Sequence, residues 1–312
     1  MPPVSVSMSL PTSQAHLLAF VFALSYVGSL YVAKEGRLSF TSGASSNFRS
    51  KGRDDPEVIR TRLRAVTFSS IFSALLLLYI CSMDVLKWRK LTGLALPLPS
   101  FSVFLTLSPV GVASNITRFY LPYLLIPILY TGPLYVIYLR KRMPFQQNSL
   151  GLLPSLKSVI GNIIGVRNYV VAPITEEVVF RACIVAVYRL SGATRWKIVW
   201  GAPLWFGMAH LHHAWETYNT LGKSPDALKQ AVAQTAFQFI YTTLFGAYCV
   251  DVFLLSSNIL APLIAHVVAN FMGMPMLGYE KRMLPRHQRS ITAMYLLGVA
   301  LFTTGLVSCH SI

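Results

Sequence analysis

Long apolar stretches alternate with short polar connections along the whole chain. They cover residues 15–33, 65–82, 119–139, 198–211, 231–256, 257–279 and 290–308, with weaker stretches near 91–113 and 159–190. About 20 apolar residues cross the hydrocarbon core of a bilayer, and these runs are too long for the alternating strands of a membrane barrel. The pattern therefore predicts an all-α, polytopic integral membrane protein with about eight transmembrane helices, some of them short or broken.

The polar connections divide the chain only weakly. Residues 1–14 form a polar N-terminal tail that lacks the basic start of a cleaved signal peptide, so the first apolar run should remain as a membrane helix. The rest, 15–312, is expected to be a single membrane domain in which the basic stretch 34–64 is a flexible loop. Because ionisable side chains inside apolar runs fall almost entirely in the second half, we assign N-terminal helices to 15–150 and catalytic core helices to 151–312.

Composition and charge support a membrane protein. Hydrophobic residues make up 54% of the chain and charged residues only 12%, against about 25% charged residues in soluble domains. The net charge of +16 is gathered in patches between the apolar runs, at Lys34–Arg64, Lys87–Lys90, Arg140–Arg142 and Lys281–Arg289. This placement favours anchoring at the bilayer surface over nucleic-acid binding. The expected partner is therefore the lipid bilayer, with no nucleic acid.

The stretch ITEEVVFRA, residues 174–182, places three charges in apolar sequence. Pro173 suits the first turn of a helix, which would put both glutamates near a helix start. Arg181 follows Glu177 by one turn, so the two should form an ion pair. Glu176 projects from a different face and aligns with Phe180 instead. Because burial raises the pKa of a carboxylic acid toward the range of a general base near neutral pH, Glu176 is the candidate base and Glu177 with Arg181 its support.

A second polar group lies in FGMAHLHHAWE, residues 206–216. Phe206 precedes His210 by one turn of a helix, and two further histidines, His212 and His213, follow at the end of the apolar run. A single such histidine is most often a satisfied core or interface residue. Three histidines in a chain that also buries a glutamate pair favour a functional site.

A third group lies in IAHVVAN, residues 264–270, where His266 and Asn270 share one helical face. Alone, this pair could simply join helices by hydrogen bonds within the membrane. Together, the three stretches predict one polar intramembrane cavity. Glu176 and His210 could activate water there, while His266 and Asn270 could stabilise the oxyanion of an attacked amide.

Direct attack by water is the simplest chemistry for this set, since no serine or cysteine stands beside a base in these stretches. Zinc is an alternative, because two histidines and a glutamate suit a catalytic ion. However, the chain has no HExxH sequence, and asparagine is a poor zinc ligand. The four cysteines lie in or beside apolar runs without CxxC spacing, so neither disulfides nor a cysteine metal site is predicted. We therefore expect no metal and no cofactor.

The three motifs resemble those of a known family. In chain order, EExxxR (Glu176, Glu177 and Arg181), FxxxH (Phe206 and His210) and HxxxN (His266 and Asn270) are the motifs of type II CAAX prenyl proteases and their CPBP membrane relatives. The wording around them, EEVVFRACI, FGMAHLHH and AHVVANFMGMP, is similar to the branch of Ras-converting CAAX endopeptidases. The motif region spans about residues 170–278, and the expected helix layout suits the remainder.

The resemblance implies a glutamate-type intramembrane endopeptidase. Its substrates would be prenylated proteins ending in Cys-a-a-X, such as small GTPases, from which it removes the last three residues. It also implies a multi-pass protein of the endoplasmic reticulum membrane with its active site open to the cytosol. In that family the first glutamate and the FxxxH histidine are assigned to water activation. The histidine and asparagine of HxxxN are assigned to the oxyanion.

Other functional classes remain open at this point. A zinc-dependent membrane protease could use the same His and Glu residues, and a proton-coupled transporter could use them as a proton relay. A scaffold could bind prenylated tails without cleaving them. Peptide cleavage, proton flux and binding without product distinguish the three.

Overall fold

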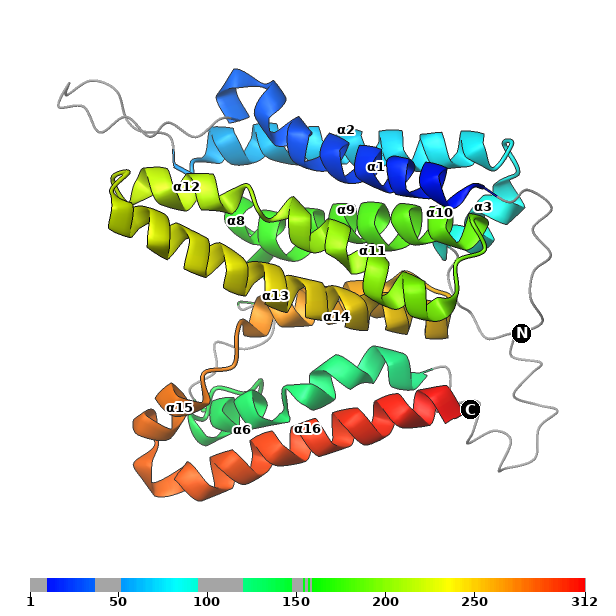
Figure 1. Ribbon diagram of the computed structural model, residues 1–312. Coiled ribbons are helices and arrows are strands. Elements are labelled where there is room, and N and C mark those ends of the chain that lie inside the picture. Colours follow the sequence, from blue (N-terminus) through cyan, green and yellow to red (C-terminus); the bar gives the residue numbers. More distant parts are fainter. Residues whose placement is uncertain are drawn as a thin grey trace. The chain divides into compact units, whose positions relative to one another are not determined.

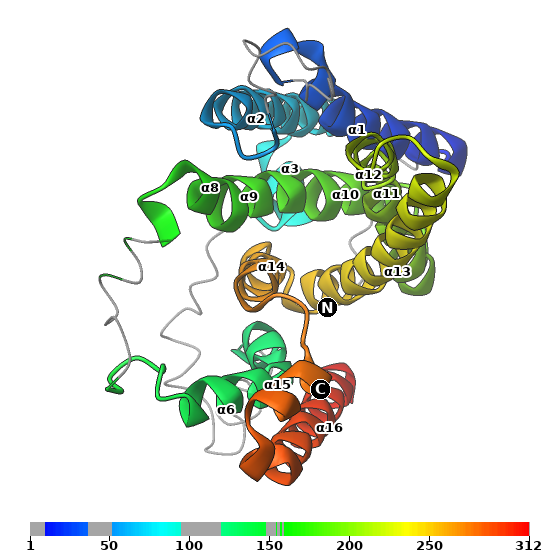
Figure 2. The same ribbon diagram turned by 90° about the vertical axis from the view of Figure 1, so that its left-hand side faces the viewer.

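The described part of the chain consists of helices and connecting turns. In this computed structural model it comprises residues 10–36, 52–94, 120–147 and 159–311, with Pro154 and Lys157. The chain groups into two compact units, Met1–Ala95 with Ile174–Phe253 and Leu96–Pro173 with Leu254–Ile312. Figures 1 and 2 show the helices of each unit in two views. The all-α class predicted from the sequence is confirmed for the described residues.

Several helices are long and apolar enough to cross a membrane. Four qualify among the described residues, and up to six if each of two bent helix pairs is counted as one span. The four cover Thr12–Val32, Pro56–Ile80, Pro225–Ser256 and Pro285–Ser311, and the bent pairs cover Tyr120–Leu139 and Leu260–Met283. The chain is therefore a multi-pass membrane protein. The predicted number of about eight stays a prediction, and most of the apolar stretch near 91–113 lies outside the described residues.

The first unit is built around a buried helical segment. Its elements are α1 (Thr12–Val32), η1 (Lys34–Gly36), α2 (Pro56–Ile80), α3 (Val85–Thr92), η3 (Glu177–Cys183), α10 (Ile184–Leu190), α11 (Arg195–Ala209), α12 (His213–Thr220) and α13 (Pro225–Ser256). Helices α1, α2, α3 and α11 all pack on η3 or α10, and α1 and α2 run side by side (Figure 1). From Val179 to Leu190 every residue is buried except Arg189. Because this segment is covered on all faces, its sequence is apolar apart from Arg181 and Arg189.

The basic stretch 34–64 is only partly a loop. Its last residues, from Pro56, are the first turns of α2. The Asp55 carboxylate accepts hydrogen bonds from the main-chain N–H groups of Glu57 at 2.9 Å and Val58 at 3.4 Å. An aspartate N-cap followed by proline at the first helical position is a strong helix start. The prediction of a loop up to residue 64 was therefore wrong for Pro56–Arg64, because composition outweighed the capping signal.

Pro173 predicts a helix start just before the charged motif, but the structure has none there. Helical segments follow one another without a break from Ile163 to Leu190: α8 (Ile163–Val166), η2 (Arg167–Val171), α9 (Ala172–Glu176), η3 and α10. Segments η2 and η3 are π-helical, with N–H groups bonded five residues back: Ala172 to the Arg167 carbonyl, and Ile184 to that of Val179. Such wide turns frequently mark functional sites. Pro173 therefore lies inside a helical run, and the predicted start was wrong.

The second unit contains a bent helix pair packed on the last helix. Tyr120–Leu129 is followed by α6 (Thr131–Leu139) at an angle of 56°, and α6 packs along α16 (Gln288–Ser311) (Figure 1). The close approach uses Gly132, because a Cβ there would collide with the Tyr295 ring of α16. Also in this unit are α14 (Leu260–Met272), α15 (Leu277–Met283) and η4 (Pro285–His287), and α14 packs on η2.

Candidate functional site

The predicted ion pair of the first motif is present and deeply buried. Arg181 Nη1 lies 3.0 Å from Glu177 Oε1, and the two side chains are 1% and 0% exposed. Both belong to η3, and the wide turn keeps the two groups on one face at a separation of four residues. Removing a single partner from such a pair leaves an uncompensated buried charge, which costs about 3–5 kcal/mol. The pair therefore holds this segment in one arrangement.

Arg181 also connects the first motif to the second. The carbon at the centre of its guanidinium lies 4.2 Å from the centroid of the Phe206 ring. The Phe206 ring in turn contacts the Phe180 ring edge-to-face at 5.1 Å and the His210 ring at 4.8 Å. A cation over an aromatic face contributes about 0.5–2 kcal/mol, most when the pair is desolvated. The last residue of EExxxR and both named residues of FxxxH therefore meet at the Phe206 ring.

His210 is held in a defined tautomer at the end of α11. Its Nδ1 lies 2.8 Å from the Phe206 carbonyl oxygen, and since a carbonyl only accepts, Nδ1 carries the hydrogen. In the neutral ring, Nε2 is then the nitrogen with a lone pair. His210 is partly buried, and the following turn is tight, with the His213 N–H bonded to the His210 carbonyl at 3.1 Å. The arrangement gives His210 a proton-accepting atom with fixed orientation.

Glu176 lies at the end of α9, directly before the ion pair, and is partly buried. Its neighbour Thr175 is attached to two other helices of the same unit. The Tyr26 hydroxyl of α1 lies 3.0 Å from Thr175 Oγ1, and Ser70 Oγ of α2 donates to the Thr175 carbonyl at 3.3 Å. These contacts on one side and the Glu177–Arg181 pair on the other restrict the backbone that carries the Glu176 carboxylate.

Close backbone packing fixes α11, which carries Phe206. A Cβ at Gly207 would collide with Thr243 Oγ1 of α13, and a Cβ at Gly246 of α13 would lie 3.0 Å from the Pro203 side chain. Small residues that allow such contact are the usual means by which helices pack within membranes. The position of the Phe206 ring therefore depends on two glycines as well as on Arg181.

The third motif lies in the second unit, on α14. His266 is buried and Asn270 is exposed. Asn270 Nδ2 donates to the main-chain carbonyl of Asn168 at 2.9 Å. In the π-helical turn of η2, the Asn168 carbonyl would normally accept from the main-chain N–H five residues later, at position 173. That residue is a proline, which has no N–H. The Asn270 side chain thus supplies the hydrogen bond that Pro173 cannot, which explains how a proline is accommodated inside the helical run.

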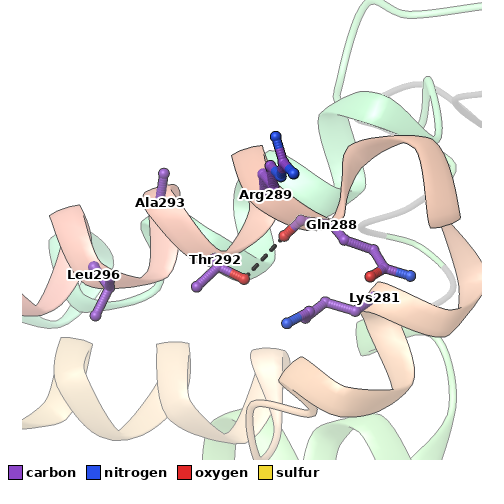
Figure 3. Close-up of a pocket in the computed structure, with 6 residues that line it drawn as sticks. All are labelled: Lys281, Gln288, Arg289, Thr292, Ala293 and Leu296. Carbon is purple, nitrogen blue, oxygen red and sulfur yellow. Dashed lines mark hydrogen bonds between the residues drawn. The ribbon is translucent and has the colours of Figure 1, made fainter.

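A hollow in the second unit contains none of the predicted site residues. It has a volume of about 360 Å³ and is lined by Lys281, Gln288, Arg289, Thr292, Ala293 and Leu296. Figure 3 shows it beside the start of α16, where Thr292 Oγ1 donates to the Gln288 carbonyl. The predicted polar cavity therefore does not coincide with this hollow. The polar cavity stays a prediction. The catalytic roles of the four residues also stay predictions: Glu176 and His210 belong to the first unit, and His266 and Asn270 belong to the second.

A polar cluster that the sequence indicated only in part surrounds the start of α12. His213 Nδ1 lies 3.0 Å from Glu216 Oε2, and Arg62 Nη2 lies 3.5 Å from Glu216 Oε1. Burial, followed by the neighbouring His213, lowers the pKa of His212 to about 4. Burial alone would raise the pKa of Glu216, but the hydrogen bond and charge of His213, with smaller contributions from His212 and Arg62, lower it overall. His212 is thus neutral near pH 7.

Comparison with known proteins identifies the family. Residues 160–272, which include all three motifs, match the family described as type II CAAX prenyl endopeptidase Rce1-like. The probable CAAX prenyl protease 2 of Schizosaccharomyces pombe is 33% identical over 289 residues, which cover 93% of this chain and 91% of that protein. The chain belongs to the Rce1-like type II CAAX prenyl endopeptidases. The resemblance drawn from the motifs is confirmed, and with it the prediction of an enzyme, a CAAX prenyl protease.

Two further members of this endopeptidase family support the assignment. CAAX prenyl protease 2 of Homo sapiens is 34% identical over 282 residues, covering 90% of this chain and 76% of the human protein. CAAX prenyl protease 2 of Saccharomyces cerevisiae is 27% identical over 281 residues, covering 83% and 79% respectively. No solved structure matches the chain. The similarity extends well beyond the motif region, so the family relationship includes the N-terminal helices.

Proposed function

We propose that this endopeptidase cleaves prenylated proteins that end in Cys-a-a-X, after the lipid-bearing cysteine, and releases the last three residues. Small GTPases with such tails are the expected substrates. The names of the relatives and the three motifs support this substrate class. The proposed location is the endoplasmic reticulum membrane, with the catalytic residues open to the cytosol and about eight membrane helices enclosing a polar cavity.

In the proposed reaction, Glu176 takes a proton from water and the resulting hydroxide attacks the scissile carbonyl carbon. His210 shares or relays the proton through Nε2 to the leaving nitrogen. His266 and the Asn270 amide donate to the oxyanion of the tetrahedral intermediate. Collapse of that intermediate breaks the carbon–nitrogen bond and frees the tripeptide. No residue becomes covalently attached to substrate, and no metal takes part.

The observation that carries this proposal is the placement of Arg181 between two motifs. It pairs with Glu177, which follows the candidate base, and stands over Phe206, one turn before the candidate proton relay. One buried cation thereby contacts the segments that present Glu176 and His210. Preorganisation of this kind is what a water-activating pair requires, because small displacements of reacting groups lower the rate steeply.

The bilayer supplies part of the substrate recognition in this proposal. Each buried methylene of a prenyl chain contributes about 0.8 kcal/mol to membrane partitioning, so the substrate cysteine is already held at the membrane. A site between helices can then accept the lipid laterally while the polar tripeptide enters water.

The test uses purified full-length protein and a farnesylated Cys-a-a-X peptide, with the unprenylated peptide as a matched substrate control. Mass spectrometry should detect the free tripeptide only from the farnesylated peptide. Binding of that peptide without any product would contradict the proposal and favour a scaffold. Proton flux in proteoliposomes without cleavage would favour a transporter.

A further inference from the structure

Three metal-binding side chains gather directly after the candidate proton relay. His212, His213 and Glu216 each offer one ligand atom, and these atoms all lie within 4.8 Å of one another. They occupy the turn after α11 and the first turn of α12, where spacings of three and four residues place side chains on one face. The ring centroids of His212 and His213 are 4.0 Å apart. None of the three is assigned a role in the proposed hydrolysis.

We propose that His212, His213 and Glu216 bind a divalent transition-metal ion, and that zinc fits this donor set best. Two imidazoles and one carboxylate form an established three-residue zinc environment, with water or another group in the fourth position. Ligand atoms about 2.0–2.1 Å from a tetrahedral zinc ion lie roughly 3.3 Å from each other. Small side-chain rotations would close the present separation of up to 4.8 Å to that value.

The groups around the cluster already provide the support that metal ligands need. Ligating histidines usually donate their second ring N–H to a carbonyl or carboxylate. His212 Nδ1 lies 2.7 Å from the Ala209 carbonyl oxygen, so it donates there and leaves Nε2 as the nitrogen with a lone pair. Arg62 contacts Glu216 Oε1 at 3.5 Å, which leaves Oε2 for the ion. The side chains of His213 and Glu216 are 18% and 12% exposed, so the site is sheltered yet open to an ion.

Metal binding would displace the hydrogen that His213 Nδ1 carries. His213 Nδ1 now shares a hydrogen with Glu216 Oε2. When the ion coordinates both groups, that hydrogen leaves Nδ1: a neutral ring becomes the Nε2–H tautomer, and a protonated ring releases one proton to solvent. The bound ion would join the turn that begins at Ala209 to the start of α12. The ring centroids of His210 and His213 are 5.9 Å apart, so the metal would brace the turn that carries His210.

The test measures metal binding directly on full-length protein with any affinity tag removed. After treatment with a chelator, wild type is titrated with Zn²⁺ against a chromophoric competitor, and with Co²⁺ to record the absorption of a tetrahedral site. We expect one tight site per chain, and an affinity at least about 100-fold lower in Glu216→Gln. Glu35→Gln and His287→Gln, which change exposed residues, serve as matched controls and should bind as wild type does.

Two results would overturn the metal site. One is equal affinity for Zn²⁺ in wild type and Glu216→Gln, and the other is a Co²⁺ spectrum of wild type that shows only weak octahedral bands. The cobalt measurement needs no variant, so a folding defect in Glu216→Gln leaves the proposal testable. Zinc should also raise the thermal midpoint of wild type but not of Glu216→Gln. Tight zinc binding without peptide cleavage would contradict the proposed function alone.

Discussion

The Arg181 guanidinium stands 4.2 Å above the Phe206 ring and connects two motifs that lie 25 residues apart along the chain. The same guanidinium pairs with Glu177 at 3.0 Å. A charge that is 1% exposed is costly to bury, and here it is compensated by a carboxylate on one side and an aromatic face on the other. Replacing either Glu177 or Phe206 would therefore remove one of the two groups that compensate the buried guanidinium.

The aromatic face should matter more than the apolar volume it fills. Phe206→Leu keeps a buried apolar side chain but removes the ring, so we expect a loss of about 0.5–2 kcal/mol in stability and a lower turnover per folded molecule. Phe206→Tyr, which keeps the ring, should retain more turnover. Thermal unfolding and peptide cleavage measure the two effects.

The matched control for that change is Phe253→Leu, at a ring 1% exposed in α13. It should lower the thermal midpoint without changing turnover per folded molecule. Equal losses of turnover in Phe206→Leu and Phe253→Leu would mean that Phe206 only fills space.

Glu177 and Arg181 should behave as a unit in the folded protein. Glu177→Gln or Arg181→Met alone leaves one buried charge, so each should lower the yield of folded protein and destabilise it by about 3–5 kcal/mol. The double variant removes both charges and should recover much of the yield and thermal midpoint. Size-exclusion chromatography and thermal unfolding test this. Additive losses in the double variant would contradict mutual compensation.

Asn270 has a structural hydrogen bond in addition to its proposed catalytic one. Asn270→Ala should lower turnover about 100-fold if the amide stabilises an oxyanion, and it should also leave the Asn168 carbonyl without its side-chain donor. Adding Pro173→Ala restores a main-chain N–H in that register. The double variant Pro173→Ala/Asn270→Ala should therefore regain stability but not turnover. Recovery of cleavage as well would assign Asn270 a purely structural role.

Metal removal should separate the proposed zinc site from hydrolysis. Treatment with phenanthroline, followed by removal of the chelator, should leave cleavage of the farnesylated peptide within about 10-fold of the untreated enzyme, because Glu176 rather than an ion activates the water. Cleavage assays before and after treatment, and after zinc is returned, give the result. Complete loss that zinc restores would support a zinc-dependent protease instead.

Local patterns predicted the parts of the site that depend on nearest neighbours. Spacing of four residues was enough to predict the Glu177–Arg181 pair, and the three motifs were enough for the family. The contact between Arg181 and Phe206 depends on how η3 packs against α11. A short sequence pattern holds no information about that packing. The HHxxE spacing of His212, His213 and Glu216 was visible in the sequence, but its link to Arg62 required the fold.

Two sequence predictions failed for identifiable physical reasons. A proline normally has no place in a helix interior, so Pro173 by itself predicts a helix start. Here the wide turn of η2 and the hydrogen bond from Asn270 accommodate it. The composition of residues 56–64 predicts a loop, whereas Asp55 and Pro56 start helix α2 there, Asp55 as its N-cap and Pro56 as its first residue. In both cases a few specific hydrogen bonds decide the local structure, and neither composition nor the usual preference of proline predicts them.

The central claim is that the Glu176 carboxylate activates the attacking water. The most direct measurement compares cleavage of a farnesylated Cys-a-a-X peptide by wild type, Glu176→Gln and the matched surface variant Glu35→Gln, each confirmed as folded by thermal unfolding. We predict that Glu176→Gln binds the peptide but releases no tripeptide, while Glu35→Gln cleaves as wild type does. Tripeptide release by folded Glu176→Gln at a rate close to that of wild type would contradict the account.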